Sequence, residues 1–179
     1  LYSRAQIESL RGEMEAAQGE RREELTRLYY ALLDGYIDAR VSDLQDEVVT
    51  SLATATATVA GTAYPFHALV PEISRTPDPT QRERLLEGMV EVIAPRDELL
   101  SRLHGETEAA MVDLGYEGYL GFFAAVKRVD YARFAAVVER TLDLTRPLYE
   151  KYVGAWAQAE LGRPLDGLSC AHNYWLRRN

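Results

Sequence analysis

Cysteine and lysine are scarce in this 179-residue sequence, which contains one cysteine and, among its 20 basic residues, only two lysines. The single cysteine, Cys170, cannot form a disulfide within the chain, so a reducing compartment is expected. Arginine takes the place of lysine almost throughout and alanine is abundant, a composition typical of a GC-rich bacterial source.

Three further features are missing from the sequence. It contains no apolar run of about 18 residues that could span a bilayer, and it does not begin with a signal peptide. The net charge is −8, and only Arg177 and Arg178 form a basic pair near the end, so phosphate binding by clustered cations is not expected. These absences predict a cytoplasmic protein with neither nucleic acid nor membrane as a partner.

Of all residues in the sequence 47% are apolar, and in the first part of the chain they are arranged with helical spacing. Ser3 and Gln6 have the spacing of a capping box, which predicts that a helix starts there. A broad apolar stripe predicts a second helix from about Glu20 to about Gln45.

Residues 51–66 have a different period, because threonine and alanine side chains alternate there and Gly61-Thr62 interrupts the run. Alternation of two residues, enrichment in β-branched side chains and a glycine-containing turn predict a β-hairpin. An alanine-rich helix is the alternative interpretation, which the repeated threonines disfavour.

Several prolines in the middle of the chain predict where helices begin and end. Pro71, Pro77 and Pro79 predict a loop, and Asp78 before Pro79 predicts the start of a helix. Pro95 predicts a kink or a break in that helix, and Gly115 is placed to end the pattern as a left-handed cap.

In the last part of the chain, apolar spacing predicts a short helix over 117–127. It also predicts a longer helix that starts after Asp130 and runs almost to Gly162, interrupted by Pro147. After Pro164 no helical period is visible. The sequence therefore predicts a mainly α multi-helix bundle with a small β-hairpin inserted near residues 51–66. Because it has no internal repeat and no low-complexity linker, one helical domain over 1–179 is expected, and the start at Leu1 rather than Met suggests a fragment of a larger protein.

The three histidines provide no recognisable metal or catalytic site. His104 and Glu108 are one helical turn apart, yet a di-iron bundle needs paired Glu-x-x-His motifs, and Ser101 stands where that glutamate would be. Cys170-x-His172 lacks the companion ligands that zinc requires, and His67 stands alone. No catalytic, cofactor-binding or metal-binding residue is therefore assigned.

Carboxylates and tyrosines are abundant, but both have ordinary explanations. Glu13, Glu15, Glu20, Glu23 and Glu24 alternate with arginines at spacings typical of exposed ion pairs within a helix. The 11 tyrosines suit the wall of a peptide groove, and they suit the wet rim of a helical core equally well.

Three short motifs within 111–163 carry a family resemblance. They are Leu-Gly-Tyr-x-x-Tyr from Leu114, Thr-x-Pro-Leu-Tyr from Thr145 and Leu-Gly-x-Pro from Leu161. This stretch resembles the helical region upstream of the zinc site in metallopeptidases of the thimet oligopeptidase and oligoendopeptidase F type, and a weaker likeness reaches back to about Tyr64.

The resemblance implies a helical fold that builds one wall of a deep channel for short, unstructured peptides. In that family a His-Glu-x-x-His helix holds zinc, and this chain has no such motif. We therefore expect no cofactor and no enzymatic activity in this chain, zinc and peptidase activity in its parent, and short peptides as partners of the full protein. The alternative is a free-standing helical interaction or scaffold protein.

Self-association is also expected, since a truncated region would leave apolar surface exposed. The residues expected at that surface are Tyr152, Trp156, Tyr174 and Trp175, with the last two the most exposed because no helical period surrounds them.

Overall fold

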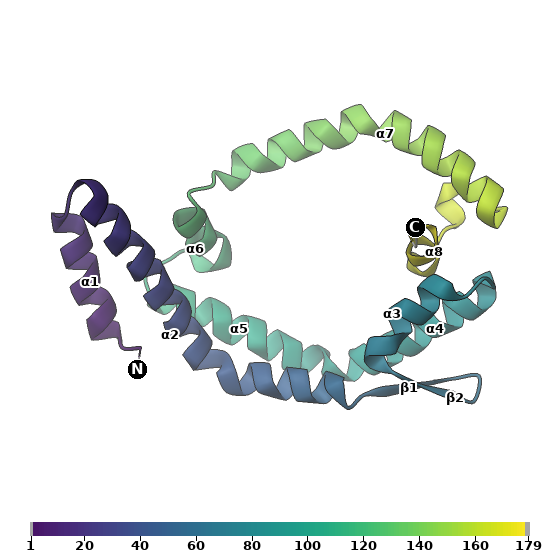
Figure 1. The fold of residues 1–179 in the computed structure, drawn as a ribbon, viewed down its shortest axis with the longest axis horizontal. Helices are drawn as coiled ribbons and strands as arrows, with labels where there is room; N and C mark the ends of the chain where they lie inside the picture. Colours follow the sequence, from purple (N-terminus) through teal and green to yellow (C-terminus); the bar gives the residue numbers. More distant parts are fainter. Residues whose placement is uncertain (1, 178–179) are drawn as a thin grey trace. The chain divides into compact units, whose positions relative to one another are not determined.

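The computed structural model describes residues 2–177. These residues form α-helices, two short 3-10 helices and one two-stranded hairpin, which confirms the predicted mainly α fold (Figure 1). They divide into two compact units. Unit 1 contains the residues up to Glu47 together with Leu99–Tyr131, and unit 2 contains Val48–Glu98 together with the residues from Ala132 onward.

Unit 1 is built from α1 (Arg4–Ala16), most of α2 (Gly19–Ala53), α5 (Asp97–Asp113) and α6 (Gly118–Lys127). The predicted capping box starts α1: the hydroxyl of Ser3 accepts from the Gln6 amide at 3.3 Å, and the Ser3 amide donates to Gln6 Oε1 at 3.0 Å. Gly115 ends α5 in the left-handed conformation, with φ of 90°, as predicted.

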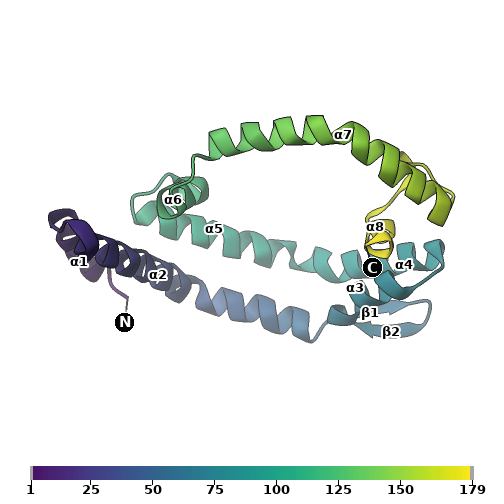
Figure 2. The same ribbon diagram turned by 45° about the horizontal axis from the view of Figure 1, so that its top comes forward.

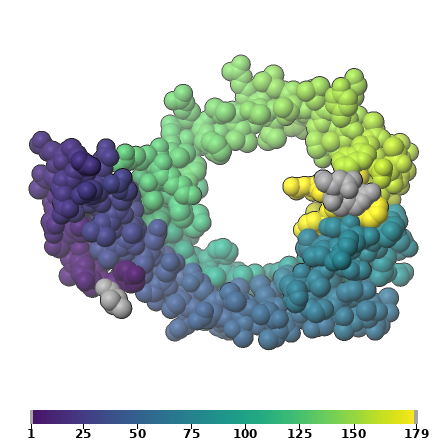
Figure 3. Space-filling view, in the orientation of Figure 1, coloured from purple at the N-terminus to yellow at the C-terminus, as the bar shows by residue number. Residues whose placement is uncertain are grey.

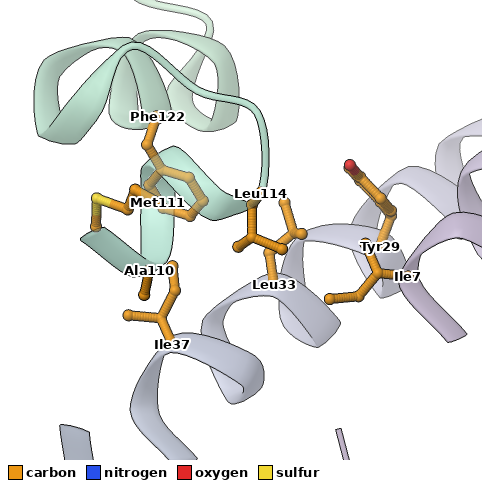
Figure 4. Packing of buried hydrophobic residues seen from close by; sticks show 8 residues of the cluster. All are labelled: Ile7, Tyr29, Leu33, Ile37, Ala110, Met111, Leu114 and Phe122. Carbon is orange, nitrogen blue, oxygen red and sulfur yellow. The ribbon is translucent and has the colours of Figure 1, made fainter. Parts of the chain in front are cut away.

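The core of unit 1 is shown in Figure 4, where side chains from all four helices meet. Leu33 and Phe122 are completely buried in it. At the edge of this core Arg11 joins α1 to α2, because its Nε and Nη2 donate hydrogen bonds of 2.9 Å and 2.7 Å to the Tyr29 hydroxyl. The buried members are Ile7, Tyr29, Leu33, Ile37, Ala110, Met111, Leu114 and Phe122.

The helix α2 continues eight residues past the predicted end at Gln45, to Ala53. Helical bonding persists because the Thr54 amide donates to the Thr50 carbonyl at 3.3 Å and the Thr54 hydroxyl donates to the same oxygen at 3.0 Å. Arg96 also holds this end, donating to the Ser51 hydroxyl at 2.6 Å and the Ser51 carbonyl at 2.9 Å. These bonds leave fewer residues for the hairpin than the alternation predicts.

The hairpin in unit 2 confirms the prediction and pairs β1 (Thr56–Val59) with β2 (Thr62–Pro65) in antiparallel register (Figures 1 and 2). Ala60 and Gly61 form the turn with φ of 50° and 83°, and two positive φ values suit the right-handed twist of a hairpin. Ala57 and Val59 are buried against α4.

One proline prediction was wrong: Pro71 lies inside α3 (Phe66–Arg75) rather than in a loop. Its ring removes one hydrogen bond to the His67 carbonyl in a short helix. Burial outweighs that loss, because Leu69 and Ile73 on either side of it are fully buried.

The helix start predicted at Asp78 and the break predicted at Pro95 are confirmed. Asp78 caps α4 (Pro79–Ile93), its carboxylate accepting from the Thr80 amide at 2.8 Å. Pro95 lies in the 3-10 helix η1 (Ala94–Arg96), which separates α4 from α5.

Two predictions near the C-terminus were wrong. The helix α7 (Tyr131–Leu161) continues through Pro147, where the proline leaves only the Asp143 carbonyl without its helical donor, and Asp143 is exposed to water. After Pro164 the chain is helical again, forming η2 (Leu165–Gly167) and α8 (Cys170–Leu176).

The short α8 forms because unit 2 covers it. Ala171 and His172 are fully buried, and the helix packs on α3 and α4, where Figure 3 shows its yellow surface against their teal. It completes a core with the hairpin and α4, whose buried members are Ala55, Ala57, Val59, Leu69, Ile73, Leu85, Val92 and Ala171.

Candidate functional site

Within unit 2 a cavity of about 430 Å³ opens between the C-terminal half of α7 and the η2–α8 segment. From α7 it receives Tyr149, Val153 and Trp156, which lie on one helical face because they are four and three residues apart. This wall of the cavity is apolar. The complete lining is Tyr149, Val153, Trp156, Leu165, Leu168, Ser169, Cys170, Asn173, Leu176 and Arg177.

The facing wall of the cavity is mixed, because Leu165, Leu168 and Leu176 line it together with polar residues. Its polar members Ser169, Asn173 and Arg177 follow one another at four-residue steps, so they form a stripe along α8 and its two ends. A hydroxyl, an amide and a guanidinium group therefore face two aromatic rings and a valine across one opening.

Beside the cavity, α7 touches the rest of unit 2 through two small residues. A Cβ atom on Gly154 would lie 3.5 Å from Leu165 Cδ1, and Ala157 is fully buried. Van der Waals contact at these two positions keeps α7 next to η2.

An ion-pair cluster behind the cavity ties α8 to α4. Glu83 Oε1 lies 2.9 Å from Arg163 Nη1 and 3.5 Å from His172 Nε2. Burial lowers the pKa of His172 below its usual 6.5, and the neighbouring Arg163 lowers it further, while Glu83 opposes both. His172 is therefore neutral at pH 7.

The tautomer of His172 follows from its neighbours. The Ser169 amide donates to Nδ1 at 3.0 Å, so the proton of the neutral ring is on Nε2, which faces Glu83. The Ser169 hydroxyl is also 2.7 Å from Nδ1.

Serine, histidine and glutamate thus occur in the order of a hydrolytic triad, but the contacts are those of a helix cap. The imidazole lone pair that would activate the Ser169 hydroxyl already accepts the Ser169 amide, and both contacts span only three residues at the start of α8. We assign this cluster to holding α8.

Most residues singled out from the sequence are not brought together. His67 and His104 are exposed in different units. Glu108 lies against Gly118, where an added Cβ would be 2.6 Å from its Oε1. Within residues 2–177 no three potential metal ligands cluster. Cys170, which is exposed, borders the cavity.

The expected surface aromatics divide into two groups. Tyr152 is 63% exposed and Trp156 is 40% exposed, as expected of an uncovered surface. Tyr174 and Trp175 were expected to be the most exposed pair, and this was wrong: Tyr174 packs against the unit 2 core, and Trp175 lies under the Arg82 guanidinium. The helix α8, which no period in the sequence predicted, leaves both of these side chains half-buried.

Comparison of the chain with family models, curated proteins and solved structures finds no match. Among the described residues, every helix is too short or too polar to cross a bilayer.

Proposed function

We propose that this chain is a non-catalytic helical region of a zinc oligopeptidase-like protein and forms part of the wall of a peptide-binding channel. In this proposal the cavity between α7 and α8 receives an apolar side chain of a short peptide. The protein acts in the cytoplasm of a bacterium, a placement supported by its single cysteine and its arginine-rich composition.

The observation that carries this proposal is a largely apolar cavity with a stripe of polar side chains on the side formed by α8 and its ends. Two aromatic rings and Val153 provide apolar area for a side chain, and Ser169 and Asn173 provide a donor and an acceptor for the peptide backbone beside it. Tyrosine and tryptophan suit such a wall, because each combines a large apolar face with one polar atom.

A free-standing interaction protein is the second candidate. It is favoured by the exposed apolar side chains along α7, which continue well beyond the cavity.

Peptide binding tests the first proposal. In a Trp175→Phe background, Trp156 is the remaining tryptophan, and its emission reports on the cavity. Capped pentapeptides with a central Phe or Leu between flanking glycines should shift that emission and reach saturation at or below millimolar concentration. The same peptide with a central Asp should cause no shift.

A matched pair of variants locates the binding. Val153→Asp places a charge on the apolar wall and should abolish the shift. Val112→Asp, at an exposed position of unit 1, should leave it unchanged. If the Phe peptide produces no saturable shift, or if Val153→Asp binds it as well as the wild type does, the cavity is not a peptide site.

The link to zinc chemistry rests on the parent gene. The proposal expects a His-Glu-x-x-His sequence downstream of this region, which would hold zinc and activate its water. Sequencing the reading frame beyond this region tests this expectation. If the reading frame contains no such motif, the interaction protein becomes the better candidate.

A further inference from the structure

The large exposed apolar residues of α7 share one side of the helix. Successive residues of an α-helix are about 100° apart, which places all nine within an arc of about 160° centred on Phe134 and Tyr152. They are between 38% and 69% exposed. We call this set the α7 arc, and its members are Phe134, Val137, Val138, Leu142, Leu144, Leu148, Tyr149, Tyr152 and Trp156.

Nearly all charged side chains of α7 fall outside the arc at the same angular step, and Glu160, near the end of the helix, falls on its margin. Those outside the arc are Arg133, Glu139, Arg140, Asp143, Arg146, Glu150 and Lys151. Gly154 and Ala157, which contact the chain's own η2 and core, also fall outside it. The packing of α7 within unit 2 therefore leaves the arc uncovered.

Two threonines near the centre of the arc do not disturb its apolar character. The Thr141 hydroxyl donates to the Val137 carbonyl at 2.8 Å, and the Thr145 hydroxyl donates to the Thr141 carbonyl at 2.8 Å. Because both hydroxyls are satisfied within the helix, the arc can be buried without leaving them unpaired.

The exposed area of the arc matches the needs of a stable interface. Its nine residues expose on the order of 800 Å², taking about 200 Å² for a fully exposed aromatic residue and about 150 Å² for an aliphatic one. A standard interface buries about 800 Å² on each partner, whereas the largest apolar patch of an ordinary monomer is about 300–600 Å².

We propose that the arc binds the arc of a second copy of this chain, with the two α7 helices parallel. One edge of the arc is purely basic and is followed by Arg133, Arg140 and Lys151. The other edge is acidic on balance, since it is followed by Glu139, Glu150 and Glu160 together with one basic residue, Arg146. A two-fold axis parallel to the helices brings the basic edge of one copy beside the acidic edge of the other. An antiparallel pair would bring like charges together.

This inference does not depend on peptide binding. Phe134 and Tyr152 belong to the centre of the arc and do not line the cavity. Substitution of these two residues therefore tests pairing without changing the cavity lining, although Tyr149 and Trp156 belong to both the arc and the cavity.

The experiment measures the mass of the purified chain by light scattering during size exclusion at tens of micromolar. The wild type should elute as a dimer. Phe134→Glu combined with Tyr152→Glu should be monomeric, with at least a tenfold weaker self-association, because four carboxylates would then meet at the seam. Both positions are exposed in the single chain, so circular dichroism should show an unchanged helix content.

The control adds the same two charges outside the arc. Ala136→Glu combined with Gln158→Glu changes exposed positions on the polar side of α7 and should remain dimeric. A monomeric wild type, or loss of the dimer in this control as well, would overturn the proposal.

Cross-linking tests the orientation in a Cys170→Ser background. Val138→Cys should form a disulfide with its own counterpart under mild oxidation, since parallel helices place equal positions together. In an antiparallel pair, centred on the arc, position 138 would instead face position 152, about 21 Å along the helix. Cross-linking only between a Val138→Cys and a Tyr152→Cys chain would therefore contradict the parallel arrangement.

Discussion

The guanidinium group of Arg82 lies over the indole ring of Trp175, with Cζ 4.7 Å from the ring centroid. Its Nη1 also donates hydrogen bonds of 2.9 Å to the carbonyls of Thr76 and Pro77, just beyond the end of α3. The side chain is fully buried, so these contacts replace the water that a guanidinium group would otherwise bind. One residue of α4 thereby joins α3 to α8.

Arg82→Ala should lower the free energy of unfolding by roughly 2–4 kcal/mol, because it leaves two carbonyls without their donor and a cavity beside Trp175. Urea denaturation followed by Trp175 fluorescence, in a Trp156→Phe background, measures the loss. Arg84→Ala removes an exposed arginine from the same helix and should change stability by less than about 0.5 kcal/mol. Equal stability of the two variants would refute the role given to Arg82.

Gly88 is required by the close approach of the hairpin to α4. A Cβ atom there would lie 2.7 Å from Val59 Cγ2 and 3.4 Å from the Cβ of Ala57. Gly88→Ala should therefore cost about 1–3 kcal/mol by overpacking, measured as a lower urea midpoint. Shortening the neighbour with Val59→Ala in the same chain should recover part of the loss.

Gly12 provides the matched control for that substitution. It lies in α1, and a Cβ added to it meets no atom within 4 Å. Gly12→Ala should stabilise the protein by up to about 1 kcal/mol, since alanine is the better helix former. A loss of stability in both variants would contradict the steric explanation.

Local sequence rules predicted the structure wherever they act within a few residues. The caps at Ser3 and Asp78, the break at Pro95 and the end at Gly115 all occur as expected, because each depends on backbone groups within one turn. The hairpin followed from its alternation and turn in the same way.

The wrong predictions are those that tertiary burial or solvation decided. Pro71 stays helical between the buried residues Leu69 and Ile73, and α8 forms because Ala171 and His172 are covered by α3 and α4. No pattern within those segments contains this information.

The candidate site was predictable only in part. Tyrosine content indicated a groove wall, and Tyr149 does line the cavity. The contact between Glu83 and Arg163 joins residues 80 positions apart, and neither belongs to a motif, so one sequence could not pair them.

The two units make a core substitution in unit 1 easy to interpret. Leu33 is fully buried among α1, α2 and α5, so Leu33→Ala should cost roughly 2–5 kcal/mol in that unit. Amide hydrogen exchange should accelerate in α1, α5 and α6. Leu28, in the same helix, is 56% exposed, and Leu28→Ala should leave exchange almost unchanged. Similar exchange in both variants would mean that Leu33 is not a core residue.

The last prediction concerns pH. Burial, assisted by Arg163, lowers the pKa of His172 below its usual 6.5 in the folded protein. When the pH falls through 6.5, the unfolded chain takes up a proton on His172 that the folded chain does not bind. This stabilising contribution is therefore complete above pH 6.5, and it is lost progressively below that value until the pH reaches the lower pKa of the folded state.

His172→Gln isolates this contribution, because glutamine retains a side-chain acceptor for the Ser169 amide in the capping box but does not titrate. The free energy of unfolding, measured by urea denaturation at several pH values, should fall less steeply below pH 6.5 in this variant than in the wild type. His104→Gln makes the same substitution at an exposed histidine of unit 1 and serves as the matched control. Carboxylates add their own slope at lower pH in all three proteins, so the difference between the two variants carries the test. Identical slopes for His172→Gln and the wild type would show that His172 binds its proton equally well in both states, which the burial of its ring beside Arg163 does not allow.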